Sequence, residues 1–348
     1  MARRLLWGSL VLAPVAIAAR FVFHAGDVLL FVLAAAALIP LAWLIGESTE
    51  HAAEHTGAGV GGFLNASFGN APELIIALFA VNAGLPNVVR GSLAGSVISN
   101  ILLVLGVALI VGGEAELDRR SLSLQLGLVF TAVLAFLVPS IPGWHGDPDR
   151  HSLAVLTIPV AIFLLCLYVV LTADNLRRHA AAHTEEALSS AWSLPRSLVT
   201  LGIATAVTAL VSEILVHSLD GFARAAGLSE FFIATVIVAI VGNAAEHGGA
   251  VVIARRGGMV LASEIAISSS AQVALLVAPA VALLSFVVQP ALPLAFRPIE
   301  LIGMGVAAIG VAFVIRDGRS HRWEGWLLVS VYGAFVVWAF LAGERGTG

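Results

Sequence analysis

The sequence predicts an all-α polytopic membrane protein with about eleven transmembrane helices, arranged as one leading helix and two inverted five-helix repeats. Two observations carry this prediction: an extreme apolar composition, and a pair of glutamate motifs that recur at a fixed offset. The 348 residues are 59% apolar and 11% charged, with a mean hydropathy of +0.99, whereas soluble domains carry about 25% charged residues. Such a chain cannot cover its own surface with polar groups, which excludes a soluble enzyme, a nucleic-acid-binding protein and a disordered scaffold.

The few charged and sulfur-containing residues narrow the class further. All 18 basic residues are arginine, against 22 Asp and Glu, so the chain has no polybasic patch for phosphates. The single cysteine, Cys166, excludes an internal disulfide framework and a thiolate metal cluster. We therefore expect a lipid bilayer as the surroundings, no nucleic-acid partner and no cofactor. The composition leaves a homo-oligomer open.

Apolar runs long enough to cross a bilayer recur along the chain. A helix needs about 20 residues to cross a hydrocarbon core about 30 Å thick. The predicted spans are residues 5–23, 27–46, 62–82, 88–112, 121–141, 152–173, 196–217, 229–254, 259–288, 298–315 and 323–342. Turn-forming segments such as Pro142-Gly143 and Arg316-Asp317-Gly318 separate neighbouring runs. The alternating pattern typical of membrane β-strands does not occur.

The longest polar interruption, from Asp174 to Pro195, divides the chain into two halves. This division predicts a leading helix at 1–25, a first five-helix repeat at 26–173, a cytoplasmic linker at 174–195 and a second five-helix repeat at 196–348. The first span also resembles a signal peptide, because Arg3-Arg4, a short apolar run and Ala16-Ile17-Ala18 follow one another. Its cleavage would leave the orientation of the later spans unchanged.

The distribution of arginines predicts a cell-membrane protein with a cytoplasmic N-terminus and an outer C-terminus. Positively charged residues favour cytoplasmic loops. With the N-terminus inside, the cytoplasmic arginines are Arg3, Arg4, Arg119, Arg120, Arg177, Arg178, Arg196, Arg255, Arg256, Arg316, Arg319 and Arg322, and the outer ones are Arg20, Arg90, Arg150, Arg224, Arg297 and Arg345.

Two short polar motifs recur with a common offset of 173 residues. Gly69-Asn70-Ala71-Pro72-Glu73 in the third predicted span matches Gly242-Asn243-Ala244-Ala245-Glu246 in the eighth. Gly95-Ser96-Val97-Ile98-Ser99 likewise matches Ser268-Ser269-Ser270-Ala271-Gln272. The shared offset indicates a duplicated unit of five spans, and because five is odd the two units enter the membrane from opposite sides. Inverted repeats are typical of secondary transporters, whose substrate site lies near mid-membrane where the repeats meet.

The residues in these motifs predict a divalent-cation site. A carboxylate in the centre of an apolar helix costs about 2.5–3.5 kcal/mol on insertion scales, so a buried glutamate indicates function. The residues Gly91 and Gly95 allow close helix approach beside it. Carboxylate, amide and hydroxyl oxygens together suit a hard cation such as Ca²⁺. The predicted metal ligands are Glu73, Glu246, Asn70, Asn243, Ser96, Ser99, Ser269 and Gln272.

The same acids are predicted to exchange metal for protons. No arginine lies near the middle of any predicted span, so burial and mutual repulsion favour uptake of protons when the metal leaves. Competition between metal and protons for the same oxygens is the basis of an antiporter with Ca²⁺ and H⁺ as its substrates. The predicted proton-coupling residues are Glu73, Glu246, Glu47, Glu50, Glu213 and His217.

At these motifs the sequence resembles the calcium/proton exchanger (CAX) family of the cation/calcium exchanger superfamily. The resemblance rests on the segments from Gly69 to Phe79, from Gly91 to Asn100 and from Gly242 to His247, together with Ser269-Ser270-Ala271-Gln272. It implies that Glu73 and Glu246 are the metal- and proton-binding acids, and that the protein exports Ca²⁺ by alternating access. The departures are Pro72 in place of the usual Thr, Ser268 in place of a common Gly, and Gly248-Gly249; they put fine selectivity in doubt, and Pro72 is expected to bend its helix.

Two alternatives stay open from the sequence. The first is a sodium-coupled calcium exchanger of the same superfamily, which needs additional sodium ligands. The second is an intramembrane zinc hydrolase, because His51-Ala52-Ala53-Glu54-His55 fits a short zinc-protease pattern without an evident third ligand. These residues, with Glu47 and Glu50, also fit an acidic vestibule or a solvated helix end.

Overall fold

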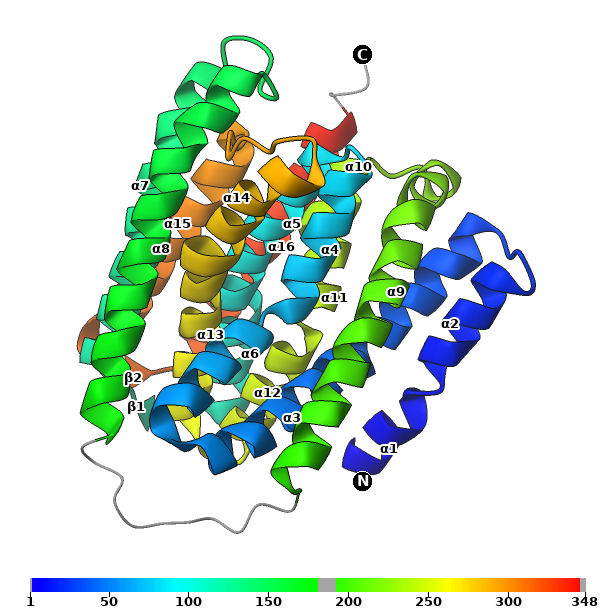
Figure 1. Ribbon diagram of the computed structural model, residues 1–348. Helices are drawn as coiled ribbons and strands as arrows, with labels where there is room; N and C mark the ends of the chain where they lie inside the picture. Colours follow the sequence, from blue (N-terminus) through cyan, green and yellow to red (C-terminus); the bar gives the residue numbers. More distant parts are fainter. Residues whose placement is uncertain (1, 181–191, 345–348) are drawn as a thin grey trace.

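The computed structural model describes residues 2–180 and 192–344, and most of these residues are helical (Figure 1). The first half contains α1 (Ala2–Ser9), α2 (Leu12–Phe21), α3 (Asp27–Phe68), α4 (Ala71–Asn82), α5 (Pro86–Ile98), the π-helical turn η1 (Ser99–Val104), α6 (Leu105–Gly112), α7 (Arg119–Gly143) and α8 (His151–Ala180). The second half contains α9 (Leu194–Ala226), α10 (Glu230–Phe232), the π-helical turn η2 (Ile233–Val238), α11 (Ala239–Gly242), α12 (Ala244–Arg255), α13 (Met259–Gln272), the π-helical turn η3 (Val273–Val277), α14 (Ala278–Val288), α15 (Pro298–Val314), the 3-10 turn η4 (Ile315–Asp317) and α16 (Arg322–Glu344).

The predicted polytopic helical class is confirmed, but the expected count of eleven spans is not. Nine helices in the described part of the chain are long and apolar enough to cross a membrane, or ten if the bent α10–α12 segment counts as one span. The predicted span 62–82 is not one helix, because α3 continues to Phe68 and α4 supplies only 12 residues. Of the predicted linker 174–195, residues 181–191 lie outside the described part.

Both glutamate motifs break their helices at the same place. Asn70 and Asn243 have φ/ψ values of −100°/18° and −92°/9°, so neither continues a regular helix. The segments on either side of Asn243 are bent by 59°. The first break lies at Asn70 and not at Pro72, where a bend was expected, and the second motif, with Ala245 at the position equivalent to Pro72, also breaks. The asparagine, not the proline, is therefore the feature that the two breaks share.

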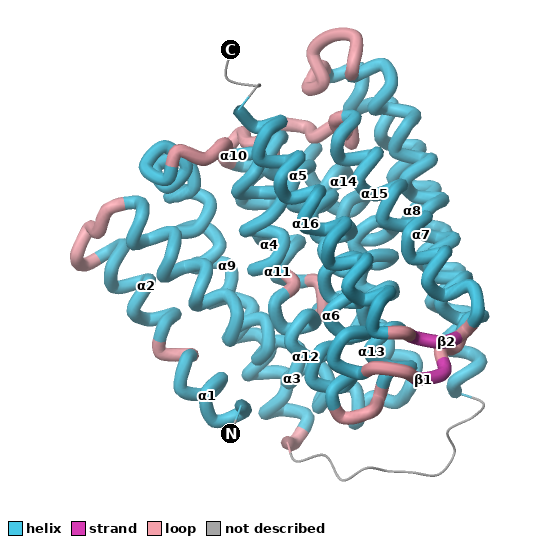
Figure 2. Tube along the Cα trace, turned by 180° about the vertical axis from the view of Figure 1, so that it is seen from behind, coloured by secondary structure: helices cyan, strands magenta, loops and turns pink. Residues whose placement is uncertain are grey.

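The helices form two groups that meet along α4, α11 and α12. On one side, α2, α3 and α9 form a layer in which α3 and α9 pack extensively along each other (Figure 1). On the other side, α7 and α8 form the far edge of the molecule (Figure 2). The strands β1 (Ala115–Glu116) and β2 (Arg319–Ser320) pair antiparallel at the end opposite the α7–α8 loop. We refer to the two ends of the molecule as the strand end and the α7–α8 end.

Close backbone contact fixes the position of α5 in the interior. A Cβ atom added to Gly95 would lie 2.0 Å from the backbone oxygen of Thr235 in η2. Only glycine permits this approach, as the sequence predicted. The turns η1 and η3 begin at Ser99 and directly after Gln272. Such wide turns are frequent at functional sites, because they change the direction of the side chains that follow.

Candidate functional site: an interior pair of glutamates

Glu73 and Glu246 meet in the interior, each in the first turn of a helix that begins after a break. Each is the third residue of its helix, in α4 and α12 respectively. Glu73 is 7% exposed and Glu246 is partly buried. The two carboxylates are close enough to interact electrostatically. Gly242 makes room for this arrangement, since an added Cβ would lie 3.3 Å from Oε1 of Glu73.

Three oxygens of the two motifs are buried without a hydrogen-bond partner among the described residues. They are Oε2 of Glu73, Oε2 of Glu246 and Oδ1 of Asn70. Buried polar atoms are almost always paired, so three orphaned oxygens require an explanation. Carboxylate and amide oxygens are ligands that hard divalent cations prefer. The donor set therefore fits a bound cation, or protons on the two acids.

The two asparagines connect the halves of the chain. Nδ2 of Asn70 donates a hydrogen bond of 2.6 Å to Oε1 of Gln272 in α13. Nδ2 of Asn243 donates a bond of 2.8 Å to Oγ of Ser96 in α5. Each asparagine therefore reaches a helix of the other half, and Asn70, Asn243 and Ser96 are all at most 2% exposed. The structure brings these four predicted ligands together at the helix breaks.

The two remaining predicted ligands lie beside the same helices. Ser269, 4% exposed, lies close enough to Glu246 for the two side chains to interact. Ser99 is fully buried, and its hydroxyl donates to the backbone oxygen of Ser96 at 3.2 Å. Ser269 is therefore placed to contact a cation held by Glu246, whereas the Ser99 hydroxyl is already used within its own helix.

Two residues that the sequence did not assign to the site complete its polar network. Nδ2 of Asn100 donates to Oδ1 of Asn243 at 3.1 Å, and Oδ1 of Asn100 lies 2.9 Å from Nε2 of His247. Both Nδ2 and Oδ1 of Asn243 are therefore hydrogen-bonded, whereas Oδ1 of Asn70 has no partner among the described residues. The sequence position of Asn100 could have indicated that it belongs to the site, because it lies four residues after Ser96 and hence on the same helical face.

The other predicted proton-coupling residues lie on α3 and α9. Glu50, Glu213 and His217 are exposed. Glu47 is half-buried, and its Oε1 lies 3.6 Å from Nε2 of His51. The predicted relay on α9 is therefore placed on an exposed helix face, away from the hydrogen bonds that surround the interior pair.

The histidines of the predicted zinc motif, His51 and His55, make contacts with other side chains and with the backbone. His51 lies 3.4 Å from Glu54 and stacks on Trp192, while Nε2 of His55 lies 2.7 Å from the backbone oxygen of Trp192. Residues 2–180 and 192–344 contain no group of three or more His, Cys, Asp or Glu side chains that could hold a metal ion. Arg196 also lies over the Trp192 ring. This cluster therefore joins α3 to the start of α9.

Comparison with known proteins identifies the family. The model of the family "Sodium/calcium exchanger protein" matches residues 26–174 and 196–341. The chain is 37% identical over 330 residues to the Ca²⁺/H⁺ antiporter ChaA of Bacillus subtilis (strain 168), covering 91% of this chain and 93% of that protein. It is 32% identical over 349 residues to a Ca²⁺/H⁺ antiporter of Aphanothece halophytica, with coverages of 94% and 93%.

Solved structures show the same architecture. Native YfkE matches with a TM-score of 0.83 and 34% identity over 97% of this chain and 99% of its own. An H⁺/Ca²⁺ exchanger, CAX, matches with a TM-score of 0.73 at 16% identity over 99% and 93% of the two chains, which shows the fold. The protein is thus a multi-pass membrane transporter and not an enzyme, and the zinc-hydrolase alternative falls. The chain belongs to the sodium/calcium exchanger family, within its calcium/proton exchanger branch.

Proposed function

We propose that this protein is an antiporter that exports Ca²⁺ from the cytoplasm in exchange for H⁺, with Glu73 and Glu246 as the shared binding site. The observation that carries the proposal is the electrostatically coupled pair with an orphaned Oε2 on each acid. Two adjacent buried carboxylates are stabilised either by a divalent cation or by protons, and not by both at once. The names of the antiporters to which the chain is 32–37% identical support the same pair of substrates.

The ligand assignment extends to neutral oxygens around the pair. We assign Oδ1 of Asn70 and the hydroxyl of Ser269 to the ligand set, because the first has no hydrogen-bond partner among the described residues and the second interacts with Glu246. Gln272 and Ser96 act mainly by holding Asn70 and Asn243, respectively, in place. Ca²⁺ takes six to eight oxygen ligands, so water or backbone oxygens would complete its coordination.

Alternating access follows from where the site lies. The two glutamates belong to different halves of the chain, and both stand at helix breaks. We propose that 26–173 and 196–348 are inverted five-helix repeats whose relative motion opens the site to each side in turn. The family model, which matches the two halves separately, supports this division. The arginine distribution supports a cytoplasmic N-terminus and an outer C-terminus.

Glu47 and Glu50 on α3, and Glu213 and His217 on α9, are proposed to serve proton movement. The extensive packing between α3 and α9 places these residues in one layer of the molecule. The exposure of Glu50, Glu213 and His217 suits exchange with water or with lipid headgroups better than metal binding. Their neutralisation is expected to change the rate of exchange and to leave calcium affinity intact.

The test is pH-gradient-driven uptake of radioactive calcium into inside-out vesicles. Glu73→Gln and Glu246→Gln each keep the size of the side chain and remove the charge, and each is expected to abolish uptake. Glu116→Gln is the matched control, because Glu116 is exposed in β1 and far along the chain from either motif. Substantial uptake by either site variant, present at normal levels in the membrane, would refute the mechanism.

Sodium coupling is the competing function, and the family model favours it because its description covers sodium/calcium exchangers. The discriminating measurement is calcium flux driven by a sodium gradient with pH clamped on both sides. We expect no flux above the level in protein-free liposomes. A sodium-driven flux lost in Glu73→Gln would replace protons by sodium as the counter-ion.

A further inference from the structure

The segment between α14 and α15 is irregular but deeply buried. Residues 289–297, which we call the buried segment, form no helix or strand, yet Leu292, Leu294 and Phe296 are at most 2% exposed. Irregular backbone within a membrane protein must have its N–H and C=O groups paired inside the protein. Side chains from other elements therefore have to supply the partners that a neighbouring strand would supply in a sheet.

Hydroxyl and indole groups from three helices pair this backbone. Oγ of Ser285 in α14 accepts from N of Leu292 at 2.7 Å, and Oγ1 of Thr157 in α8 accepts from N of Leu294 at 3.1 Å. Two further bonds come from α7 and the residue that follows it: Ser140 Oγ accepts from Phe296 N at 2.9 Å, and Trp144 Nε1 donates to Phe296 O at 2.8 Å. The buried segment is thus fixed to both halves of the chain.

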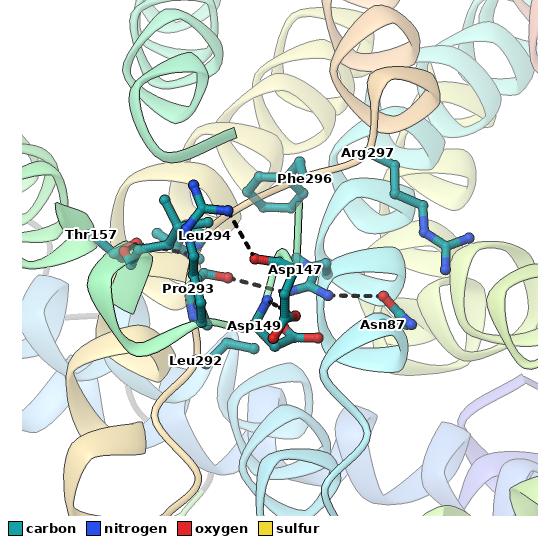
Figure 3. Close-up of polar contacts among 12 residues, drawn as sticks. Asn87, Asp147, Asp149, Thr157, Leu292, Pro293, Leu294, Phe296 and Arg297 are labelled. Atoms are coloured by element: carbon teal, nitrogen blue, oxygen red, sulfur yellow. Dashed lines mark hydrogen bonds and ion pairs between the residues drawn. The ribbon is translucent and has the colours of Figure 1, made fainter. Parts of the chain in front are cut away.

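Arg90 of α5 adds a positively charged side chain to the groups that bond the buried segment. Nη1 of Arg90 donates to Oδ1 of Asp149 at 2.7 Å and to the backbone oxygen of Pro293 at 3.4 Å, and Nη2 donates to Oδ1 of Asn87 at 2.8 Å. Figure 3 shows this convergence of the α7–α8 loop, the buried segment and α5. Although the sequence places Arg90 among loop arginines, the side chain is 1% exposed.

The surroundings of Arg90 are expected to make its contacts difficult to break. Asp149 is 36% exposed in its side chain, but Arg90 itself is shielded from water, which strengthens its pairing. Glu300 in α15 is a buried acid within electrostatic range of Arg90, and its carboxylate accepts a hydrogen bond from the backbone N of Arg297. Removing the guanidinium would leave acceptors of three segments without a donor.

We propose that Arg90 is a positioning residue that locks the buried segment as a fixed plug at the α7–α8 end, so that this part of the protein does not open during transport. The helix that carries Arg90 continues directly to Ser96, so the same lock holds one wall of the cation site in register. The consequence for transport rests on the proposed antiport, whereas the plug itself is a property of the fold. By this inference, opening at the α7–α8 end takes place on the side of α3 and α9.

The test measures local exposure of Leu294 with a thiol-reactive maleimide on detergent-solubilised protein. Leu294→Cys is introduced into a Cys166→Ser background, and the labelling rate is compared with and without Arg90→Gln. We expect Arg90→Gln to raise the rate by about tenfold or more, because the local opening that exposes the cysteine becomes more frequent. Arg90→Lys, which keeps the charge but not the forked geometry, is expected to give a smaller rise.

Two controls separate a lock from general loosening. Leu122→Cys is a second reporter, fully buried near the start of α7 at the strand end, and its rate should not change. Arg224→Gln removes a positive charge from an exposed side chain near the end of α9 that pairs within its own helix with Asp220, and should leave both reporters unchanged. Equal acceleration of both reporters, or none at Leu294, would overturn the proposal.

A variant that folds poorly still leaves the inference testable. If Arg90→Gln cannot be purified, Asp149→Asn removes the ion pair while Asn87 and Pro293 remain bonded to Arg90, and a smaller rise at Leu294 alone is expected. No rise at Leu294 in Asp149→Asn would then overturn the proposal. Because labelling needs no calcium and no gradient, failure of the antiport proposal would not change its outcome.

Discussion

Asn70 and Gln272 are joined by a hydrogen bond of 2.6 Å although 202 residues separate them in the sequence. The corresponding bond of the second motif does not mirror it: Asn243 bonds to Ser96, and not to Ser99, the residue that the 173-residue offset pairs with Gln272. The two halves therefore bring the same asparagine to the site but hold it differently. One consequence is that Oδ1 of Asn70 is left for a ligand while Oδ1 of Asn243 is bonded to Asn100.

Gln272→Met is expected to weaken calcium binding without abolishing exchange. The substitution keeps the length of the side chain and leaves Nδ2 of Asn70 unpaired, which costs about 1–3 kcal/mol for a buried group. We therefore expect the KM for Ca²⁺ to rise by about tenfold at an unchanged maximal rate. Gln125→Met on α7, which loses only a local bond to Ser121, is the control. An unchanged KM together with lowered stability would show that Gln272 is structural.

Asn100 and His247 are expected to be energetically coupled. Asn100→Leu leaves Oδ1 of Asn243 without its donor and Nε2 of His247 without its partner, so we expect a loss of about 1–3 kcal/mol in the free energy of unfolding. A double-mutant cycle with His247→Leu, measured by denaturant titration in detergent, should give a coupling of about 0.5–3 kcal/mol. A second cycle that combines Asn100→Leu with Thr157→Val should be additive, and a coupling of zero in the first cycle would contradict the hydrogen bond.

Gly95→Ala is expected to separate α5 from η2 and to impair folding or transport. The added methyl would lie 2.0 Å from a backbone oxygen of Thr235, which cannot move aside as a side chain can. Overpacking of this kind costs about 1–3 kcal/mol or more. In Gly91→Ala the shortest approach is 2.8 Å, to the side-chain hydroxyl of Thr235, so this variant should cost less, while Gly127→Ala meets nothing within 4 Å. We expect the thermal unfolding midpoint to be lowest for Gly95→Ala, intermediate for Gly91→Ala and highest for Gly127→Ala.

Calcium binding is expected to release protons. If Ca²⁺ and H⁺ compete for Glu73 and Glu246, the apparent calcium affinity falls as the pH falls, because protonated carboxylates must first lose their protons. Calorimetric titrations at one pH in buffers of different ionisation enthalpy should therefore give different apparent enthalpies. The dependence on buffer should disappear with binding itself in Glu246→Gln. Equal enthalpies in all buffers, with calcium bound, would contradict proton-coupled binding.

Much of the fold was predictable because a bilayer imposes length and polarity on every spanning helix. The predicted runs coincide with helices along most of the described chain, and the 173-residue offset drew attention to the residues that the structure brings together. The count of spans was less predictable. Hydropathy registers apolar composition and cannot distinguish one continuous helix from two that meet at Asn70 or Asn243, where only the backbone changes direction.

The interior partners of Arg90 could not be predicted in the same way. Arg90 lies near the start of the predicted span 88–112 and was placed with the outer arginines, yet it is buried against Asp149 and Pro293. Both partners are distant in the sequence, and Pro293 lies in a segment without helical or strand periodicity. The role of Asn100 was missed for a similar reason, since its bonds cross between the halves of the chain.

The sequence by itself determined that the chain is a helical membrane protein and that two acids stand at equivalent positions. The length of each apolar run and the internal repeat can both be read along the linear sequence. Only the tertiary structure decided which oxygens stay unpaired and which are already bonded. That outcome depends on side chains from both halves that converge in the interior. A donor or acceptor that is used in one hydrogen bond there is not available to another group. Near-identical motifs thus acquired different surroundings, since the side chain of Asn243 bonds to Ser96 and Asn100, whereas that of Asn70 bonds to Gln272 and its Oδ1 has no partner among the described residues.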